Sequence, residues 1–209
     1  MMRVFVKICG LTTPKAVAAA VDAGADAVGF VFAESPRRVT PERAAELCAD
    51  LSPVVVRVAV MRHPAPAEWD EVANGFGPDW LQTDAGDFTT LAVADRFGRL
   101  PVYRDTPDFD AASLDASAPD VDEPVLFEAA DSGRGARADW GRAAEVARTR
   151  RLVLAGGLTP DNVGEAIRIV RPWGVDVSSG VESKRGVKDL GRIAAFVQAV
   201  REAELANAG

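Results

Sequence analysis

The sequence is poor in several residues on which whole protein classes depend. Its 209 residues include one histidine, one tyrosine and two cysteines. Two cysteines are too few for a disulfide framework, and Cys9 and Cys48 lack metal-ligand spacing, so we expect a reduced, cytoplasmic protein without a structural metal. The single histidine, His63, lies in the proline-rich stretch MRHPAPAE. We interpret it as a solvated loop residue, which argues against histidine-based catalysis.

Basic charge and long apolar runs are also scarce. The chain has 24 Lys and Arg against 31 Asp and Glu, a net charge of −7. Such an acidic chain has no general attraction for nucleic acid or anionic lipid, so an anionic ligand needs a locally positive pocket. No apolar run approaches the ~20 residues that span a bilayer, and the one in MMRVFVKICG is too short for a signal peptide. We therefore expect neither a nucleic-acid nor a membrane partner.

Short, β-branched apolar segments are what the chain has in abundance. They begin near residues 3, 26, 54, 79, 101, 124, 151 and 174, at intervals of 22 to 28 residues. Amphipathic, alanine-rich segments typical of helices separate most of them, and Gly24 has the context of a helix stop. Three of these segments follow a threonine that fits the N-cap and a proline that fits the first helical position: Thr13-Pro14, Thr40-Pro41 and Thr159-Pro160.

This alternation predicts a parallel sheet, because a strand–helix repeat returns each strand in the same direction. Eight units favour a single-domain (β/α)₈ TIM barrel over residues 1–209, and an open doubly wound sheet is the alternative. The fifth unit, DTPDFDAASLDASAPDVDE, is acidic and rich in turn residues, so its helix is expected to be short or absent.

A barrel carries its active site at the carboxyl ends of its strands, and alternate strand residues point inward. In the first strand this places Phe5, Lys7 and Cys9 inside the barrel. Glu128 ends the sixth strand, PVLFE, and is expected to turn inward as well. In the eighth strand Asp176 and Ser178 share the inner face.

Two turns at the end of the chain favour phosphate binding. Glycine and serine follow the seventh and eighth strands, where barrels often bind phosphate through exposed backbone N–H groups. Tight turns alone are the alternative explanation. The candidate residues are Gly156, Gly157, Ser178, Ser179 and Gly180.

The remaining candidates are open to two interpretations. Cys9 is either a base or nucleophile or a small buried hydrophobe, while Cys48 is expected to be only the latter. Arg37 can pair with a substrate carboxylate through its planar fork, whereas Arg38 is expected to be solvated. Asp84 ends the fourth strand and either lines the mouth of the site or caps a helix.

Four segments together resemble one known family. They are KICGLT at 7–12, GADAVGFVFAESPR at 24–37, LAGGLTPDNV at 154–163 and VDVSSGVESKRGVKD at 175–189. The chain resembles phosphoribosylanthranilate isomerase of tryptophan biosynthesis. The resemblance implies a barrel of the ribulose-phosphate-binding type that performs an Amadori rearrangement of a phosphorylated small molecule without cofactor or metal.

The resemblance also implies roles for individual residues. Cys9 maps onto the base and Glu128 onto the acid, while Arg37 maps onto the contact with the anthranilate carboxylate. The turns at 156–157 and 178–180 map onto the phosphate site, and Asp176 onto a wall of the site. Lys7 and Asp84 join the substrate-binding candidates. A monomer or a homodimer is expected.

Three departures from the family pattern lie at the predicted catalytic face. Glu128 stands where the family has aspartate, and Asp131, close by, is an alternative acid. Asp84 replaces a common histidine, and VMRHP replaces the usual V-F-V-N. These changes leave open a relative that acts on another phosphorylated amino-sugar, or a catalytically weak phosphosugar-binding barrel. Cys9 argues against a bifunctional histidine–tryptophan isomerase.

Overall fold

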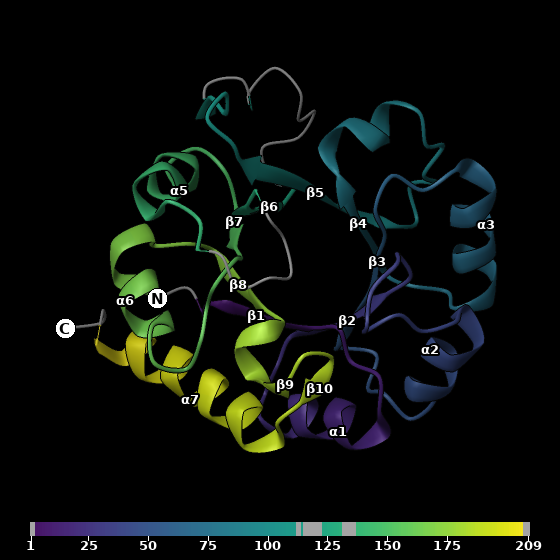
Figure 1. Ribbon diagram of the computed structural model, residues 1–209, viewed down its shortest axis with the longest axis horizontal. Coiled ribbons are helices and arrows are strands. Elements are labelled where there is room, and N and C mark those ends of the chain that lie inside the picture. The colour runs from purple at the N-terminus through teal and green to yellow at the C-terminus, as the bar shows by residue number, and fades with distance from the viewer. Residues whose placement is uncertain (1–2, 112–113, 115–122, 131–136, 207–209) are drawn as a thin grey trace.

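Eight parallel strands close into a barrel in the order of the chain, from β1 to β8 and back to β1 (Figure 1). The computed structural model describes residues 3–111, 114, 123–130 and 137–206. The strands are β1 (Phe5–Cys9), β2 (Ala27–Val31), β3 (Val56–Val60), β4 (Trp80–Asp84), β5 (Gly98–Asp105), β6 (Val125–Ala129), β7 (Leu152–Leu154) and β8 (Gly174–Val177). The predicted (β/α)₈ fold is thus confirmed, and the open-sheet alternative is wrong.

Helices surround this ring of strands (Figure 1). Those with described bounds are α1 (Pro14–Asp22), α2 (Pro41–Leu47), α3 (Pro66–Gly75), α5 (Trp140–Ala147), α6 (Val163–Val170) and α7 (Leu190–Ala206), with short 3₁₀ helices η1 (Ala85–Thr89) and η3 (Ser179–Val181). None of the helices in this part of the chain has both the length and the apolar character that crossing a membrane requires. Most of the predicted short fifth helix lies outside the described residues.

Two of the three predicted threonine caps start a helix. Thr13 Oγ1 accepts from Ala16 N and Thr40 Oγ1 from Arg43 N, so each satisfies a free N–H of the first turn. Gly24, with φ of 90°, ends α1 as predicted.

The third predicted cap, Thr159 before Pro160, is wrong. Helix α6 begins at Val163, and Asn162 occupies its N-cap position. Asn162 Oδ1 accepts from Thr159 N at 2.8 Å, so the amide side chain closes a turn in front of the helix.

Strand parity divides the core into two layers. Val6, Ile8, Phe127 and Val175 pack with the helices in the outer layer, while a separate inner cluster contains Leu100, Val102, Leu126, Val153 and Ala155. Phe5 stacks on Trp80 and Trp173, with ring centroids 5.6 and 4.6 Å away. Phe5 and Trp80 begin β1 and β4, and Trp173 directly precedes β8, so the three rings close the amino-terminal end of the barrel.

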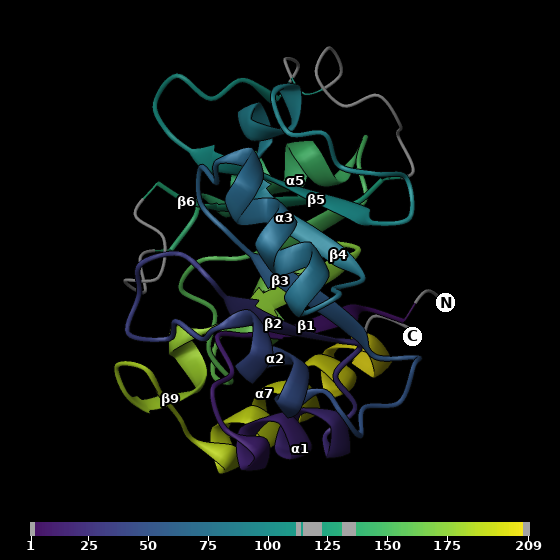
Figure 2. The ribbon, with the colours of Figure 1, turned by 90° about the vertical axis from the view of Figure 1, so that its right-hand side faces the viewer.

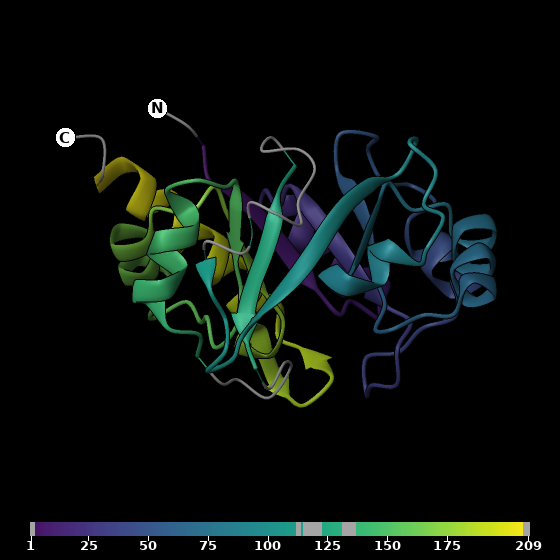
Figure 3. The same cartoon turned by 90° about the horizontal axis from the view of Figure 1, so that it is seen from above.

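The chain ends and the polar loops lie at opposite ends of the barrel. Near the amino-terminal end, Arg201 of α7 donates to Val4 O at 2.8 Å and joins the first strand to the last helix. At the other end, strands β9 (Glu182–Lys184) and β10 (Val187–Lys188) form a hairpin that projects away from both termini (Figures 2 and 3). The carboxyl ends of the strands therefore open toward this hairpin.

Candidate active site

The end of β1 places a thiol beside a buried ion pair. Cys9 is buried, and Lys7, two residues earlier on the inner face, has no exposed surface. Lys7 Nζ lies 2.7 Å from Oδ1 of Asp176, its register partner on β8. Gly29 on β2 leaves room here, because a Cβ at this position would stand 3.2 Å from Cys9 Sγ. The structure thus brings together Lys7, Cys9 and Asp176, as predicted.

Burial governs the ionisation of these groups. It raises the pKa of the Cys9 thiol above its ordinary value of 9.0, although the Lys7 ammonium opposes the change. Burial alone would lower the pKa of Lys7, but Asp176 and Cys9 together outweigh it and hold that pKa above its ordinary value. Cys9 is therefore a neutral thiol at rest, beside a positive charge that favours the thiolate once the proton leaves.

Glu128 ends β6 on the inner face of the barrel, opposite Arg104 in the register of β5 and β6. Glu128 Oε1 accepts from Arg104 Nη1 at 2.8 Å. Arg104 Nε donates to Asp84 Oδ1, also at 2.8 Å, so one guanidinium joins carboxylates from β4 and β6. Two roles were open for Asp84. It lines the same cavity as Cys9 and Glu128, and its side chain makes no helix-capping hydrogen bond.

Burial raises the pKa of Glu128 from 4.5 to about 7, although the Arg104 guanidinium opposes the shift. Asp176 and Asp84 add to the increase because a second negative charge nearby disfavours ionisation. A carboxyl group with this pKa is protonated in about half of the molecules at neutral pH, which is the condition a general acid needs.

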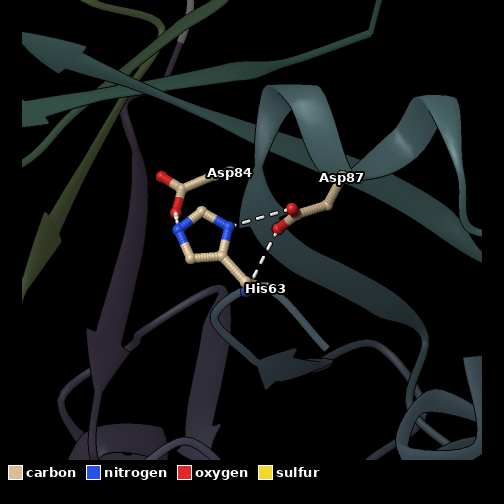
Figure 4. A group of neighbouring side chains, drawn as sticks. All are labelled: His63, Asp84 and Asp87. Carbon is tan, nitrogen blue, oxygen red and sulfur yellow. Dashed lines mark hydrogen bonds and ion pairs between the residues drawn. The ribbon is translucent and has the colours of Figure 1, made fainter. Parts of the chain in front are cut away.

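His63 contacts the outer side of Asp84 (Figure 4). Its side chain is 62% exposed, as expected for a loop residue, yet Nε2 lies 3.2 Å from Asp84 Oδ2. Nδ1 is hydrogen-bonded to Asp87 Oδ1 at 3.0 Å. The ligand atoms of these three residues lie within 4.8 Å of one another, which suits a metal ion by donor type. The second oxygen of Asp84, however, is held by Arg104, whose positive charge opposes a cation.

Arg37 is held by a partner that the sequence did not reveal. Its Nε and Nη2 donate to Glu182 at 2.6 and 2.9 Å, and both side chains are buried. Lys188 Nζ lies 2.9 Å from the same carboxylate and donates to Ser178 O at 2.8 Å. Arg38, in contrast, is exposed as expected. Arg37 and Lys188 thus place two buried cations beside the turn after β8.

The two predicted phosphate turns lie against each other. Gly156, Gly157, Ser178, Ser179 and Gly180 line one small cavity of about 40 Å³ together with Glu128 and Asp176. Gly156 and Gly157 have φ of 88° and 65°, conformations that side chains rarely adopt. A Cβ at Gly180 would stand 1.8 Å from Leu158 O. Glycine is therefore required for these turns to approach, and the structure brings all five residues together.

A second cavity, of about 320 Å³, joins the Cys9 thiol and the Glu128 carboxyl group. Its wall includes Cys9, Arg37, Asp84, Arg104 and Glu128. It shares Glu128, Asp176 and Ser178 with the cavity at the glycine turns, so the two are continuous. A larger hollow of about 410 Å³ lies beside it over α2 and α3. That hollow includes neither the thiol nor the Glu128 carboxyl, so we place the site at the barrel mouth.

Some of the sequence predictions cannot be followed into the structure. The alternative acid, Asp131, lies outside the described residues. Cys48 is buried at the end of α2, and burial raises its pKa to about 12, which fits an inert thiol.

Three residues of the site were not predicted from the sequence. Arg104 was detectable by parity, since Val102, two residues earlier in β5, faces inward. Glu182 and Lys188 carried no such signal, because they come from the hairpin after β8, where strand parity gives no direction.

The arrangement of acidic and basic groups at the carboxyl ends of the strands defines a (β/α)₈-barrel enzyme with acid–base chemistry. The comparisons with known proteins specify which one. The family model for N-(5′-phosphoribosyl)anthranilate (PRA) isomerase matches residues 6–199. The chain belongs to this family.

Individual relatives agree with this assignment. The chain is 44% identical to N-(5′-phosphoribosyl)anthranilate isomerase of Thiobacillus denitrificans, over 94% of this chain and 97% of the relative. A solved phosphoribosylanthranilate isomerase in complex with reduced 1-(o-carboxyphenylamino)-1-deoxyribulose 5-phosphate has a TM-score of 0.79 and 32% identity, over 97% and 100% of the two chains. Mutually generated monomers of the dimeric isomerase from Thermotoga maritima have a TM-score of 0.76 and 31% identity over the same shares.

Proposed function

We propose that the protein converts N-(5′-phosphoribosyl)anthranilate into 1-(2-carboxyphenylamino)-1-deoxyribulose 5-phosphate in tryptophan biosynthesis, with Glu128 as the acid and Cys9 as the base. One observation carries the proposal. The thiol of Cys9 and the carboxyl of Glu128 come from different strands and line the same cavity, next to the glycine turns after β7 and β8. Two groups that transfer protons at different atoms of one sugar need this placement.

In the first step Glu128 gives its proton to the ring oxygen of the ribose. The bond between C1′ and the ring oxygen breaks, the ring opens, and the nitrogen lone pair forms the C=N bond of a Schiff base. Glu128 becomes a carboxylate, which the Arg104 guanidinium stabilises at 2.8 Å. The pKa of about 7 makes the proton available at neutral pH.

The second step proceeds in the fraction of molecules in which Cys9 has lost its thiol proton to solvent, and there the thiolate removes the proton from C2′. The C–H electrons form a C1′=C2′ double bond, and those of the C=N bond return to nitrogen. The resulting enolamine becomes the ketone when C1′ gains a proton and the C2′ hydroxyl loses one. Lys7, held by Asp176, supplies positive charge that favours the thiolate against the cost of burial. The step requires no cofactor or metal.

The substrate's two anionic ends have separate candidate partners. The phosphate fits the glycine and serine turns, where positive φ at Gly156 and Gly157 lets the backbone approach closely. The anthranilate carboxylate is assigned to Arg37. Since Nε and one N–H of Nη2 of Arg37 bind Glu182, the substrate contact is left to Nη1 and to the second N–H of Nη2.

The direct test follows the fluorescence of freshly generated phosphoribosylanthranilate as it is consumed. We expect turnover by the wild-type protein and a loss of about 10²-fold or more in Cys9→Ala and Glu128→Ala. Glu128→Asp keeps the carboxyl but retracts it by one methylene, so a loss of about 10²-fold is also expected. If the wild-type protein consumes no phosphoribosylanthranilate above background, the proposal is refuted. Full activity in Glu128→Ala would refute the assignment of Glu128 as the acid.

The other outcomes identify the two alternatives left open by the sequence. Phosphate binding without turnover favours a phosphosugar-binding barrel. A large gain of activity in Glu128→Asp favours a relative whose glutamate serves another phosphorylated amino-sugar.

The proposal also includes the setting of the reaction. A thiol base needs a reducing compartment, so we place the reaction in the cytoplasm. We expect the protein to be a monomer or a homodimer without bound nucleic acid. Light scattering of the protein as it elutes from a column measures its molar mass and so its oligomeric state.

A further inference from the structure

Arg104 is placed between two carboxylates by the register of the barrel. Its strand, β5, pairs with β4 on one side and with β6 on the other, and Glu128 is its direct register partner. Nε donates to Asp84 Oδ1 and Nη1 to Glu128 Oε1, both at 2.8 Å. A planar guanidinium with two such bonds has little rotational freedom. The position of Glu128 Oε1 is therefore fixed by the backbone of β5 and by Asp84.

Asp84 is in turn held on its outer side (Figure 4). His63 Nε2 lies 3.2 Å from Asp84 Oδ2, and His63 is tied to Asp87 through its ring and its backbone N–H. Asp87 also accepts from Thr83 Oγ1. A line of contacts thus runs from the solvent-exposed His63 through Asp84 and Arg104 to Glu128.

The direction of hydrogen bonding along this line limits where Glu128 can carry its proton. A guanidinium only donates, so Oε1 must accept from Arg104 in both ionisation states of the carboxyl group. Among the residues that the structure describes, Arg104 alone makes a hydrogen bond to this carboxyl group. A carbonyl oxygen accepts better than the hydroxyl oxygen of a carboxylic acid. When Glu128 is protonated, the proton is therefore favoured on Oε2, the oxygen left for a ligand.

We propose that Arg104 is a positioning residue for the acid: it holds Oε1 of Glu128, and so directs the acidic proton on Oε2 to the substrate, while Asp84 holds Arg104. This inference rests on the proposed function, since it requires Glu128 to act as an acid. It also accounts for glutamate at this position. The glutamate side chain has one more rotatable bond than aspartate, and a fixed partner at Oε1 removes that freedom.

Four charged groups on other strands of the barrel act on Glu128. They are Arg104 on β5, Asp84 on β4, Asp176 on β8 and Lys7 on β1. Arg104 favours the carboxylate, and the two aspartates disfavour it. Replacing Arg104 with a neutral residue must consequently move the titration of Glu128 to higher pH, which loss of packing alone would not do.

The test compares Arg104→Gln, Arg104→Lys and Asp84→Asn with the wild-type protein. The titration of the Glu128 carboxyl is followed by carbon-13 NMR of glutamate-labelled protein, with Glu128→Gln to assign the signal. kcat and KM for phosphoribosylanthranilate are measured on the pH plateau of each variant. The matched control is Arg57→Gln. Arg57 also donates twice to carboxylate oxygens, but both belong to Asp79, at 3.0 and 2.8 Å, and the pair lies at the amino-terminal end of the barrel.

In Arg104→Gln we expect the Glu128 titration to move up and kcat to fall about 10- to 100-fold, with KM changed by less than about threefold. Arg104→Lys keeps the charge, so it should restore the titration and part of kcat. Asp84→Asn should give a smaller loss of kcat, and Arg57→Gln should match the wild type in both readouts.

Two results would overturn the inference. One is an unchanged Glu128 titration in Arg104→Gln, whatever its turnover. The other is a shifted Glu128 titration with kcat unchanged in Arg104→Gln. Arg104 would then affect the ionisation of Glu128 without orienting its carboxyl group for proton transfer. Failure of the wild-type protein to turn over phosphoribosylanthranilate refutes the proposed function instead, and so is distinguishable from both.

Discussion

Two glutamates of the site differ in ionisation because of what donates to them. Glu182 accepts from two nitrogens of Arg37, from Lys188 and from Gly186 N, and its pKa falls from 4.5 to about 2 against the effect of burial. Glu128 has Arg104 as its donor among the described residues, and burial raises its pKa to about 7. The same side chain is thus a permanent anion in one place and a proton donor in the other.

The ionisation of Glu128 and Cys9 predicts the shape of the pH profile. Turnover needs Glu128 protonated and Cys9 ionised, yet Glu128 loses its proton near pH 7 and burial keeps the Cys9 thiol protonated above pH 9. The product of the two fractions rises with pH up to about 7, stays level, and falls only when Cys9 has titrated. We therefore expect kcat/KM to form a plateau above pH 7.

The measurement is kcat/KM between pH 5 and 10. The substrate phosphate, with a pKa near 6, also titrates in this pH range. Its titration does not depend on the protein, so it serves as the internal reference when variants are compared. A profile that declines above pH 7 instead of levelling would contradict these assignments.

The Glu182 pair predicts a stability that depends on pH. A depressed carboxyl pKa stabilises the folded state above the ordinary value of 4.5, and this contribution disappears as the pH falls toward 2. Glu182→Gln should therefore lower the free energy of unfolding by on the order of 3 kcal/mol at pH 7, and by much less near pH 3.

Urea unfolding at both pH values measures the difference for Glu182→Gln. Glu46→Gln is the control, since Glu46 pairs with Arg43 on the exposed face of α2 and should cost less than about 0.5 kcal/mol. An equal loss in Glu182→Gln at the two pH values would exclude the linkage.

Parity was sufficient to predict several residues of the site. It identified Lys7, Cys9, Glu128 and Asp176 as inward, because alternation in a strand is a local property. It could not show that Arg37 binds Glu182, since the two are 145 residues apart and meet only through barrel closure. Asp84 kept two interpretations for the same reason: its partner, Arg104, comes from the next strand.

At the scale of elements, the hydrogen bond between a side chain and a nearby backbone N–H decides where a helix begins. Thr13 and Thr40 cap α1 and α2, whereas Thr159, in the same Thr-Pro context, does not cap α6. Asn162 makes the difference, because it accepts from Thr159 N and donates to Gly157 O at 2.9 Å. A dipeptide motif does not contain that information, so the sequence misplaced this start by three residues.

This contrast predicts unequal costs for the same substitution. Thr13→Ala removes a cap and should reduce the free energy of unfolding by about 1 kcal/mol. Thr159→Ala removes no capping bond and should change it by less than about 0.5 kcal/mol. Chemical unfolding of the two variants decides the matter, and equal losses would show that Thr159 contributes a bond at the start of α6.

Strand positions were predicted more closely than helix starts. The eight expected starts lie within three residues of the observed ones, and the largest difference is at β5, which begins at Gly98 and not at Pro101. The apolar run that predicted this strand, PVYR, begins at Pro101. In the barrel, Pro101 is the register partner of Thr83 in β4 and lies inside the strand.

At the scale of the whole molecule, barrel closure brings the turns after β7 and β8 into contact. The carbonyl of Leu158 in one turn occupies the space beside Gly180 in the other, where a Cβ would be 1.8 Å away. Both turns line the small cavity beside Glu128. The spacing between them is therefore a property of the closed barrel, not of either turn.

Gly180→Ala should force the two turns apart and weaken binding of inorganic phosphate by about tenfold or more. Gly164→Ala is the matched control, because its Cβ would meet Ala203 Cβ at 3.9 Å, an ordinary contact. Calorimetric titration with phosphate compares the two. Unchanged affinity in Gly180→Ala would show that the turns do not act together.

The stack of Phe5, Trp80 and Trp173 has a consequence for substrate entry and product release. The stack closes the described amino-terminal end of the barrel, and the cavity opens at the other end beside the β9–β10 hairpin, where Arg185 lines it. The product therefore leaves through the opening by which the substrate enters, and it must dissociate before the next substrate molecule binds. A lingering product thus obstructs its own precursor, and we expect inhibition by product to be competitive.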